Sequence, residues 1–215
     1  LMELLVADIT PKENIIGSKR PSQDIIKWKG VKINEVTNEV IDINWSWYEI
    51  VGKLPLEWVP PSVRRLTVSG NKLCGTTDLT VLPDALVELS LNWNSFFGPI
   101  CLTKLPNNLE ILNVSLNDFD GPLDLTHLPV RMKELHCNSN KFCGEISLRK
   151  LPATMELLDV SENSLSGYID LTHLPRTLRE LYLDRNAFEG ETDFGHLPNA
   201  LTCLNVACNR LSGHI

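Results

Sequence analysis

LPVRMKELHCNSNKFCGEISLRKL, the stretch from Leu128 to Leu151, contains one full copy of a unit that repeats along the chain. The unit returns every 23 residues, and no residue is inserted or lost between copies. Leu-Pro pairs begin at 82, 105, 128, 151, 174 and 197, leucine stands at 66, 89, 112, 135, 158, 181 and 204, asparagine at 71, 94, 117, 140, 163, 186 and 209, and glycine at 75, 98, 121, 144, 167, 190 and 213. A fixed period of this length predicts a solenoid, in which each turn stacks on the next.

Each unit predicts one short strand followed by a return arm. In the segment 109–114, Leu112 and Val114 stand two residues apart and face the same side, which is the spacing of a strand. The asparagine that follows carries donors and acceptors for backbone groups at the bend, and we expect a stack of seven along the solenoid. The return arm, fullest at Ile169 to Pro175, contains proline and a turn, which disfavours long helices. These patterns predict a mostly β, gently curved right-handed coil with short extended or 3₁₀ segments on its convex side.

The repeat also predicts the domain organisation. Residues 1–34 lie outside the period and are expected to form an N-terminal cap over the first turn. Residues 35–215 are expected to form the solenoid, with a degenerate repeat from about Val40 and seven further turns. The sequence stops at Ile215, where the next return arm should begin, so we expect the C-terminal cap to be missing and the chain to be a fragment.

Composition excludes some classes of function. The chain of 215 residues is 43% hydrophobic and carries a net charge of -7, with 20 Lys and Arg scattered among 27 Asp and Glu. Nucleic acid needs a clustered basic face, so it is not an expected partner. No apolar run reaches the ~20 residues of a membrane span, and no cofactor motif is present.

The six cysteines do not read as a disulfide set. Cys137 occupies an apolar core position, and Cys74 and Cys143 lie three repeats apart, roughly 14 Å at the usual strand spacing. Free thiols favour a reducing compartment. Two Asn-X-Ser triplets, at Asn44 and Asn113, leave a secreted or surface location open.

The combined frame LxxLxVxxNxFxGxI resembles leucine-rich repeat proteins, and the resemblance covers about residues 40 to 215. The Gly-X-Ile element looks like the plant receptor type, whereas the LPxxLxxLxV opening is similar to the short repeats of bacterial effectors. The mixture is similar to repeat proteins of protists, including surface antigens of kinetoplastids. The resemblance implies a curved solenoid with a parallel β-sheet on the concave face, used mainly as an adaptable binding surface. The paired cysteines that lock secreted caps of this family are absent, which favours an intracellular location.

Three columns of the predicted strands point outward, and their residues vary while the leucines do not. The first column is Asn44, Thr67, Ser90, Asn113, His136, Asp159, Tyr182 and Asn205. The second column is Ser46, Ser69, Asn92, Ser115, Asn138, Ser161, Asp184 and Ala207. The third column, at the strand exit, is Trp47, Gly70, Trp93, Leu116, Ser139, Glu162, Arg185 and Cys208.

These columns predict a binding face that is apolar toward the N-terminus and charged toward the C-terminus. Tryptophan, tyrosine and arginine are common anchors of interfaces. The predicted ligand-binding residues are Trp93, Asn113, Leu116, His136, Asp159, Glu162, Tyr182, Asp184 and Arg185. The alternative for Trp47 and Trp93 is that both pack on neighbouring turns.

Two chemical interpretations are weaker. His136 beside Asp159, with Ser115 or Ser161 nearby, has the residue types of a hydrolase, but an open sheet offers no oxyanion site or sheltered cleft. A pH-sensitive contact at His136 is the more plausible use of that side chain. On the return arms, His173 and His196 stand on adjacent turns, but two histidines without a third ligand are a weak metal signal. We therefore expect no catalytic residues, metal or cofactor.

The sequence favours a non-catalytic module that binds a protein or peptide on its concave face. A secreted or surface receptor or antigen domain that recognises a glycan or host ligand is the first alternative, since Asn and Ser columns offer hydrogen bonds and Trp93 offers a stacking surface. A structural spacer within a larger assembly is the second.

Overall fold

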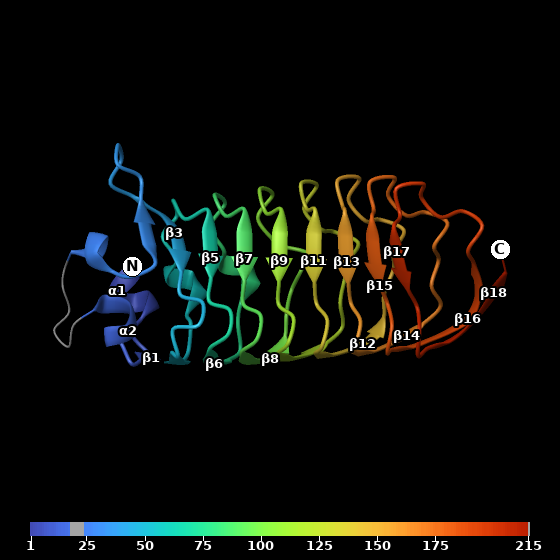
Figure 1. Cartoon of the computed structure of the whole chain (residues 1–215), viewed down its shortest axis with the longest axis horizontal. Coiled ribbons are helices and arrows are strands. Elements are labelled where there is room, and N and C mark those ends of the chain that lie inside the picture. The colour runs from blue at the N-terminus through green and yellow to red at the C-terminus, as the bar shows by residue number, and fades with distance from the viewer. Residues whose placement is uncertain (18–23, 215) are drawn as a thin grey trace.

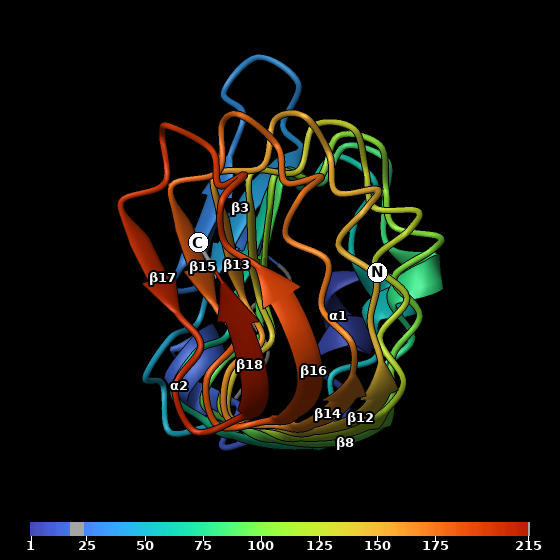
Figure 2. The same ribbon diagram turned by 90° about the vertical axis from the view of Figure 1, so that its right-hand side faces the viewer.

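The computed structural model describes residues 1–17 and 24–214 and shows a solenoid built from two β-sheets (Figures 1 and 2). Each sheet has nine strands, and consecutive turns of the chain add one strand to each. The turns stack along the long axis of the molecule, with the two ends of the chain at opposite ends of the stack. The predicted fold class, a mostly β leucine-rich repeat type of solenoid, is confirmed.

The first sheet, which we call the front sheet, contains the strands predicted from the leucine column. Its strands in chain order are β2 (Val31–Ile33), β3 (Val40–Asn44), β5 (Arg65–Thr67), β7 (Glu88–Ser90), β9 (Ile111–Asn113), β11 (Glu134–His136), β13 (Leu157–Asp159), β15 (Glu180–Tyr182) and β17 (Cys203–Asn205). From β3 onward all neighbours are parallel, and their leucines pair in register, as Leu135 does with Leu112 and Leu158. Only β2 pairs antiparallel, along β3. This is the sheet that the sequence pattern placed on the concave side.

The second sheet, which we call the lateral sheet, was not predicted. It contains β1 (Ile9–Thr10), β4 (Val51–Gly52), β6 (Lys72–Gly75), β8 (Ser95–Pro99), β10 (Asp118–Gly121), β12 (Lys141–Glu145), β14 (Ser164–Gly167), β16 (Ala187–Asp193) and β18 (Arg210–His214). The strands from β4 onward are parallel, and β1 is antiparallel to β4. The glycine column lies within these strands and has positive φ from Gly75 to Gly190, as at Gly98 with φ 84°.

The return arms contain little helix. Two of them carry 3₁₀ segments, η2 (Leu56–Trp58) and η3 (Leu79–Val81), and the others run through turns. Several arms begin with an Asp-X-Thr turn, in which the Asp170 carboxylate accepts hydrogen bonds from the backbone N–H and the hydroxyl of Thr172. These bonds hold the pKa of the Asp170 carboxyl below its usual value. The expectation of short extended and 3₁₀ segments is thus confirmed for the arms.

The N-terminal residues pack against the first turns of the solenoid. They form α1 (Met2–Leu5), α2 (Glu13–Ile16) and η1 (Ile25–Lys27), together with strands β1 and β2. Ile15 and Trp28 are buried in the same apolar core as the repeats, and the Trp45 indole N–H donates to the Lys29 carbonyl at 3.0 Å. Residues 18–23 of the predicted cap lie outside the described residues. The two α-helices have four residues each, and no helix in the described part of the chain is a candidate membrane span.

One continuous core runs between the two sheets. The leucine column is fully buried through the middle of the array, as at Leu112 and Leu135. A second inward column stacks Phe96, Phe119 and Phe142, with ring centroids 6.1 and 6.2 Å apart and planes within 10° of parallel. Because each turn contributes the same side chains at the same height, the core has no single centre.

The predicted asparagine stack is present along the solenoid. The Asn140 side-chain N–H₂ donates to the Val114 carbonyl of the preceding turn at 3.0 Å and to the Cys137 carbonyl of its own turn at 3.2 Å. Its side-chain oxygen accepts the Phe119 backbone N–H at 3.0 Å. The same contacts recur at each asparagine of the column. Each asparagine therefore ties its own turn to the one before it.

The cysteines are all free thiols, as expected from their spacing. Cys137 is fully buried in the core, and its burial raises the pKa of the thiol.

Candidate ligand-binding face

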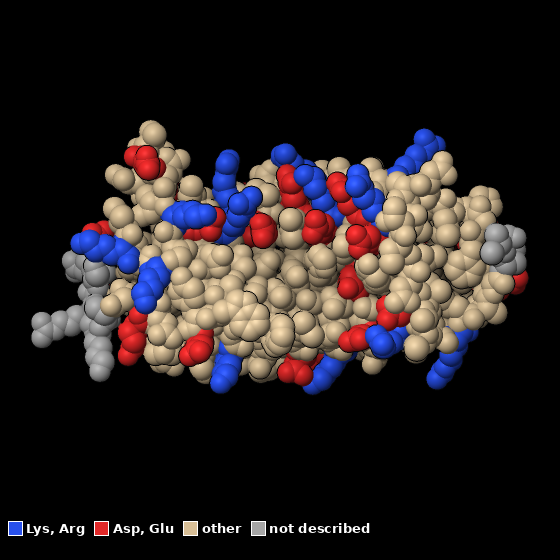
Figure 3. All heavy atoms as spheres, in the orientation of Figure 1, with Lys and Arg blue, Asp and Glu red and all other residues tan. Residues whose placement is uncertain are grey.

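The front sheet presents the three predicted outward columns, and the structure divides them into two regions. From Asn44 to Ser139 the columns contain no Lys, Arg, Asp or Glu, whereas Asp159, Glu162, Asp184 and Arg185 follow on the next two turns. Figure 3 shows the same division: uncharged atoms cover the middle of the face toward the N-terminus, and acidic atoms enter it toward the C-terminus. The front sheet therefore has an uncharged part toward the N-terminus and a charged part toward the C-terminus.

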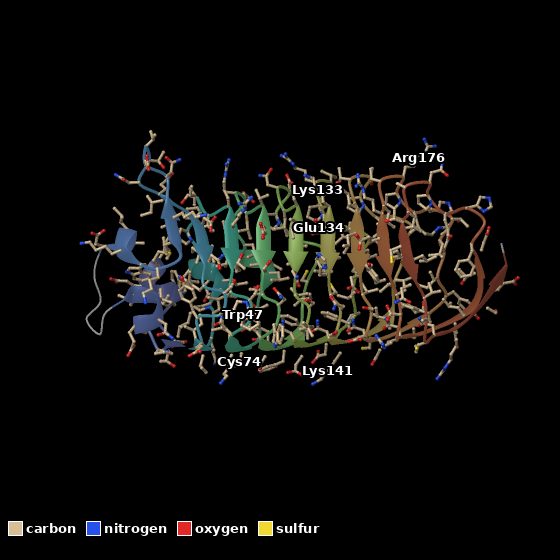
Figure 4. The ribbon with its side chains drawn as sticks, in the orientation of Figure 1. Trp47, Cys74, Lys133, Glu134, Lys141 and Arg176 are labelled. Carbon is tan, nitrogen blue, oxygen red and sulfur yellow. The ribbon has the colours of Figure 1, made fainter. Side chains whose placement is uncertain are left out.

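The strand-exit column has a backbone conformation that the sequence did not reveal. Its residues take φ values between 52° and 60° in every repeat that lacks glycine there, and Gly70 has φ 67°. This left-handed region favours glycine or asparagine and is unusual for bulky side chains. The conformation directs each strand-exit side chain out of the turn between the front and lateral sheets, where Trp47 lies in Figure 4.

Trp47, Trp93 and Leu116 form an exposed apolar surface that we call the aromatic platform. The two tryptophans contact each other. Their ring centroids lie 5.1 Å apart with the planes at 71°, an edge-to-face contact. The Trp47 ring covers Gly70 on the turn between them, where a side chain at that position would clash with it. Even so, Trp47 is 63% exposed, Trp93 57% and Leu116 43%. Trp47 thus packs on the neighbouring turn at Gly70, and Trp93 packs on Trp47, while both side chains keep more than half of their surface exposed.

Asn113 and Asp159 play the same local role on different strands. The Asn113 side-chain oxygen accepts the backbone N–H and the hydroxyl of Ser115 at 3.0 and 2.7 Å, and Asp159 does the same with Ser161 at 3.0 and 2.6 Å. Both serines are buried. Because burial outweighs the bonds from Ser161, the pKa of the Asp159 carboxyl is raised.

The His136 ring contacts a carboxylate of its own strand. Its Nε2 lies 3.3 Å from Glu134 Oε2, while the Asp159 oxygen is occupied by Ser161. The hydroxyls of Ser115 and Ser161 both donate to side chains of their own turns, so neither is placed as a nucleophile activated by His136. The front sheet does not assemble a hydrolase triad from these residues.

Charged groups toward the C-terminal end are partly paired. The Arg185 guanidinium lies 2.8 Å from Glu162 Oε1 and 3.3 Å from Asp184 Oδ2. Asp184 is buried, at 6% exposure, and Arg185 is the cation paired with it. The Tyr182 hydroxyl donates to Glu180 Oε2, on the same strand, at 2.8 Å.

Sequence reasoning missed a further outward column, which stands one residue before the core leucine. It comprises Asp42, Arg65, Glu88, Ile111, Glu134, Leu157, Glu180 and Cys203. The signal was available, because residues two positions before the first predicted column must share its face. This column adds Glu134 and Glu180 to the acidic end of the face.

This column and the edge of the front sheet beside it carry a row of ion pairs. The row contains three pairs on successive parts of the sheet: Arg65 with Glu88 at 3.3 Å, Lys133 with Glu110 at 2.7 Å, and Arg179 with Glu156 at 3.8 Å. In Figure 4 Lys133 lies beyond Glu134 toward this edge, and Figure 3 shows both signs of charge along it. The row is internally neutralised, so it marks the border of the uncharged band rather than a site of one sign.

The return arms offer no metal site in the described residues. His173 Nδ1 lies 3.2 Å from Asp170 Oδ2, and His196 Nδ1 lies 2.8 Å from Asp193 Oδ2, so each histidine is held within its own turn. No group of three or more His, Cys, Asp or Glu side chains that could hold a metal was found in residues 1–17 and 24–214.

A hollow of about 500 Å³ lies on the return-arm side, lined in part by Cys101, Thr103 and Glu145. Cys101 takes the place of aspartate in an Asp-X-Thr turn, and hydrogen bonding with Thr103 lowers the pKa of its thiol. This hollow is separate from the three columns of the front sheet.

Comparison with known proteins identifies the fold. A crystal structure of a plant ice-binding protein superposes with a TM-score of 0.69 at 22% identity, covering 94% of this chain and 75% of that one. The Arabidopsis receptor kinase HAESA, solved with the peptide hormone IDA and the co-receptor SERK1, gives a TM-score of 0.59 at 28% identity, covering 80% of this chain and 30% of that one. The BIR3–SERK2 complex from Arabidopsis thaliana gives 0.59 at 22% identity, covering 88% and 93%.

These similarities support the leucine-rich repeat architecture that the sequence pattern predicted. The chain spans only 27% and 30% of the lengths of two receptors that it resembles, RGFR1 and HAESA. Neither a protein-family model nor a curated protein matches the chain.

Proposed function

We propose that this leucine-rich repeat chain is a non-catalytic recognition module that binds a protein or peptide partner on its front sheet. The observation that carries the proposal is the aromatic platform. Trp47, Trp93 and Leu116 keep 43% to 63% of their surface exposed, whereas core leucines such as Leu112 and Leu135 are fully buried. A contiguous apolar patch with a polar rim is typical of a protein interaction site.

The rigidity of the front sheet supplies the mechanism of binding. Every strand is hydrogen-bonded to both neighbours from β3 to β15, and the asparagine stack fixes the exit of each strand. A partner that docks on such a surface orders few new groups, so less of the interaction free energy is lost to entropy. Trp93, Tyr182 and Arg185 are the anchors we expect, since these residue types dominate binding energy at interfaces.

Two of the similar structures support a partner of this class. HAESA was solved with a peptide hormone and a co-receptor, and BIR3 with SERK2. The absence of a built acid–base site among the predicted residues supports the non-catalytic part of the proposal, because both candidate nucleophiles are bonded within their own turns.

The test is an affinity capture from extracts of the source cell with three forms of the chain. The first is the unchanged chain, and the second replaces Trp93, Tyr182 and Arg185 with alanine. The third is a matched control that replaces Trp58, Tyr168 and Arg176, exposed residues of the same three types outside the three columns. Arg176 is labelled in Figure 4, beyond the strands of the front sheet.

We expect partners that are captured by the unchanged chain and the control but lost from the front-sheet variant. Loss from both variants, or from neither, contradicts binding on the front sheet. Circular dichroism and thermal unfolding of all three forms exclude a trivial loss through misfolding.

A further inference from the structure

We propose that the partner is an extended peptide segment that lies across the strands, with an apolar side chain on the aromatic platform and a basic side chain over the acidic end of the face. This inference rests on the proposed function and specifies the chemistry of its ligand. It also predicts toward which end of the solenoid the basic side chain lies and the separation of the two anchor residues.

The apolar anchor point follows from the backbone of the strand-exit column. Gly70 shows that glycine fits this left-handed position, yet Trp47, Trp93 and Leu116 occupy it with φ values of 60°, 57° and 53°. Such conformations cost free energy for bulky residues. Burial does not compensate, because all three side chains remain largely exposed. A complementary apolar group is the ligand that such a platform selects.

The basic anchor point follows from an imbalance of charge. The C-terminal part of the face carries five acidic residues: Glu134, Asp159, Glu162, Glu180 and Asp184. After Arg65, the four outward columns contain a single basic residue, Arg185. Arg185 is shared by two of these acids. Within the described residues, no Lys or Arg nitrogen is paired with Asp159 or Glu180.

The uncharged band, which is the part of the three main columns from Asn44 to Ser139, does not attract a charged side chain of the ligand, whereas the acidic end does. Five successive turns, from Asn44 to Ser139, carry the platform together with uncharged polar side chains and His136 on the three main columns, with no Lys, Arg, Asp or Glu. Complementarity between surfaces of opposite sign sets the orientation of a partner more than its affinity. A peptide with one basic end is therefore oriented with that end toward β13 and β15.

The paired strands fix the path of the peptide. The backbone groups of β3 to β15 are used within the front sheet, so a ligand cannot join as an added strand between them. It contacts the side-chain columns and runs along the solenoid axis. Trp93 and Glu162 share a column three turns apart, which is about 14 Å at the usual strand spacing. An extended chain advances roughly 3.3 Å per residue, so the two anchors are separated by about four residues.

The experiment uses fluorescein-labelled peptides of twelve residues in a Gly-Ser background, each with one Phe and one Arg. The separation between Phe and Arg is varied from two to seven residues. For each separation one peptide has Phe before Arg and a second has Arg before Phe. Fluorescence anisotropy gives the dissociation constants, and amide NMR shifts locate the contacts. Matched peptides replace Arg with Glu or Phe with Ser.

We expect the tightest binding at a separation of about four residues. Replacement of Arg with Glu is expected to weaken binding about tenfold. Asp159→Asn with Glu162→Gln should remove the preference for Arg and leave the contribution of Phe, while Trp93→Ala should do the reverse. The control for lost charge is Asp120→Asn with Glu145→Gln, two exposed acids of the lateral sheet, which should change nothing.

Equal binding of the Arg and Glu peptides, or no dependence on separation, overturns this inference. The proposed function survives that result if the capture experiment still shows a partner that depends on Trp93, Tyr182 and Arg185. A neutral oligosaccharide series provides the remaining arm. If β-linked glucose or N-acetylglucosamine oligomers shift the front-sheet amides and the peptides do not, the ligand is a glycan and the peptide proposal is wrong.

Discussion

The asparagine column shows how one side chain can define a turn of this solenoid. Each carbonyl in the stack is shared, since the Val114 carbonyl accepts from Asn140 and from Asn117 at 3.2 Å. The Asn140 side-chain oxygen is not shared in this way. It accepts the hydrogen bond of the Phe119 backbone N–H in the adjoining turn. Loss of the asparagine therefore leaves the carbonyls partly satisfied and one buried donor without a partner.

Asn140→Ala is expected to lower the free energy of unfolding by about 1 to 3 kcal/mol, the cost of an unsatisfied backbone group. Asn138→Ala is the control, because Asn138 lies on the same turn and its side chain makes no hydrogen bond within residues 1–17 and 24–214. Urea unfolding of both variants measures the difference. Equal midpoints would contradict the structural role of the column, as would a midpoint for Asn140→Ala that matches that of Trp93→Ala.

Asp159 predicts a pH dependence of stability. Its raised pKa means that the folded protein binds a proton at this site more tightly than the unfolded chain does. Stability is therefore lost at this site as the pH rises from the ordinary carboxyl value through the raised one. Asp159→Asn keeps the acceptor for Ser161, as Asn113 does for Ser115, and removes the charge.

We expect Asp159→Asn to be more stable than the unchanged chain at pH 7, by less than about 1 kcal/mol for a partly exposed group. At pH 3 the two should be equal. Thermal unfolding of both proteins from pH 3 to pH 7 measures the stability difference between them. If the variant loses stability relative to the unchanged chain as the pH rises, the prediction is wrong.

Individual residues differ in how far the sequence could predict them. The leucine and asparagine columns are fixed by burial and by hydrogen bonding, so each allows one residue type and repeats visibly. The strand-exit column repeats its left-handed conformation while its residues run from tryptophan to arginine and cysteine. Because the neighbouring turns impose that conformation, no residue preference reveals it.

The lateral sheet shows why the second strand of each turn escaped prediction. Stretches such as Ser95–Pro99 combine glycine and proline, which usually mark turns rather than strands. Here the side chain of one turn lies over the glycine of the next: Pro99 over Gly121, and Tyr168 over Gly190. At these two positions close packing across turns adds to the positive φ as a reason for glycine.

Gly190→Ala tests this packing between strands. A Cβ at Gly190 would clash with the Tyr168 ring, whereas a Cβ at Gly144 meets nothing within 4 Å. Both positions have positive φ, 89° and 84°, so the backbone strain is matched. We expect Gly190→Ala to destabilise the chain by about 1 to 3 kcal/mol more than Gly144→Ala does. Tyr168→Ala should remove that excess, and an equal effect of the two alanines would show that conformation alone requires glycine.

Across the whole molecule, burial falls toward the C-terminal turn. Leu135 and Leu158 are fully buried, whereas Leu204 and Leu211 are only partly covered in the chain of 215 residues. In an array of this kind each turn is stabilised mainly by its neighbours. Stability is then distributed unevenly along the axis, with the central turns most protected.

Hydrogen exchange followed by mass spectrometry should show this gradient. Amides of β9 to β13 are expected to exchange slowest, and those of β17 and β18 fastest among the strands. Uniform protection along the array would instead indicate that the solenoid opens as one cooperative unit.

The candidate binding face could be predicted only in part at this level. The exact repeat located the outward columns and their change from apolar to charged, because register follows from period. It could not show that Trp47 and Trp93 touch across Gly70, or that Ser161 occupies the carboxylate of Asp159. Those contacts depend on rotamers and on the turn geometry, which a period does not contain.

The uninterrupted 23-residue step has a genetic consequence. Because each asparagine bonds the turn before it, removal of one complete unit rejoins equivalent donors and acceptors. Unequal recombination between copies of the coding segment would thus shorten or lengthen the array in frame. Each such event between the aromatic platform and the acidic end would change the distance between them by one strand spacing, about 4.8 Å. If the proposed ligand is correct, insertion of a unit there lengthens the spacing between its two anchor points, while Trp93 and Glu162 themselves are unchanged.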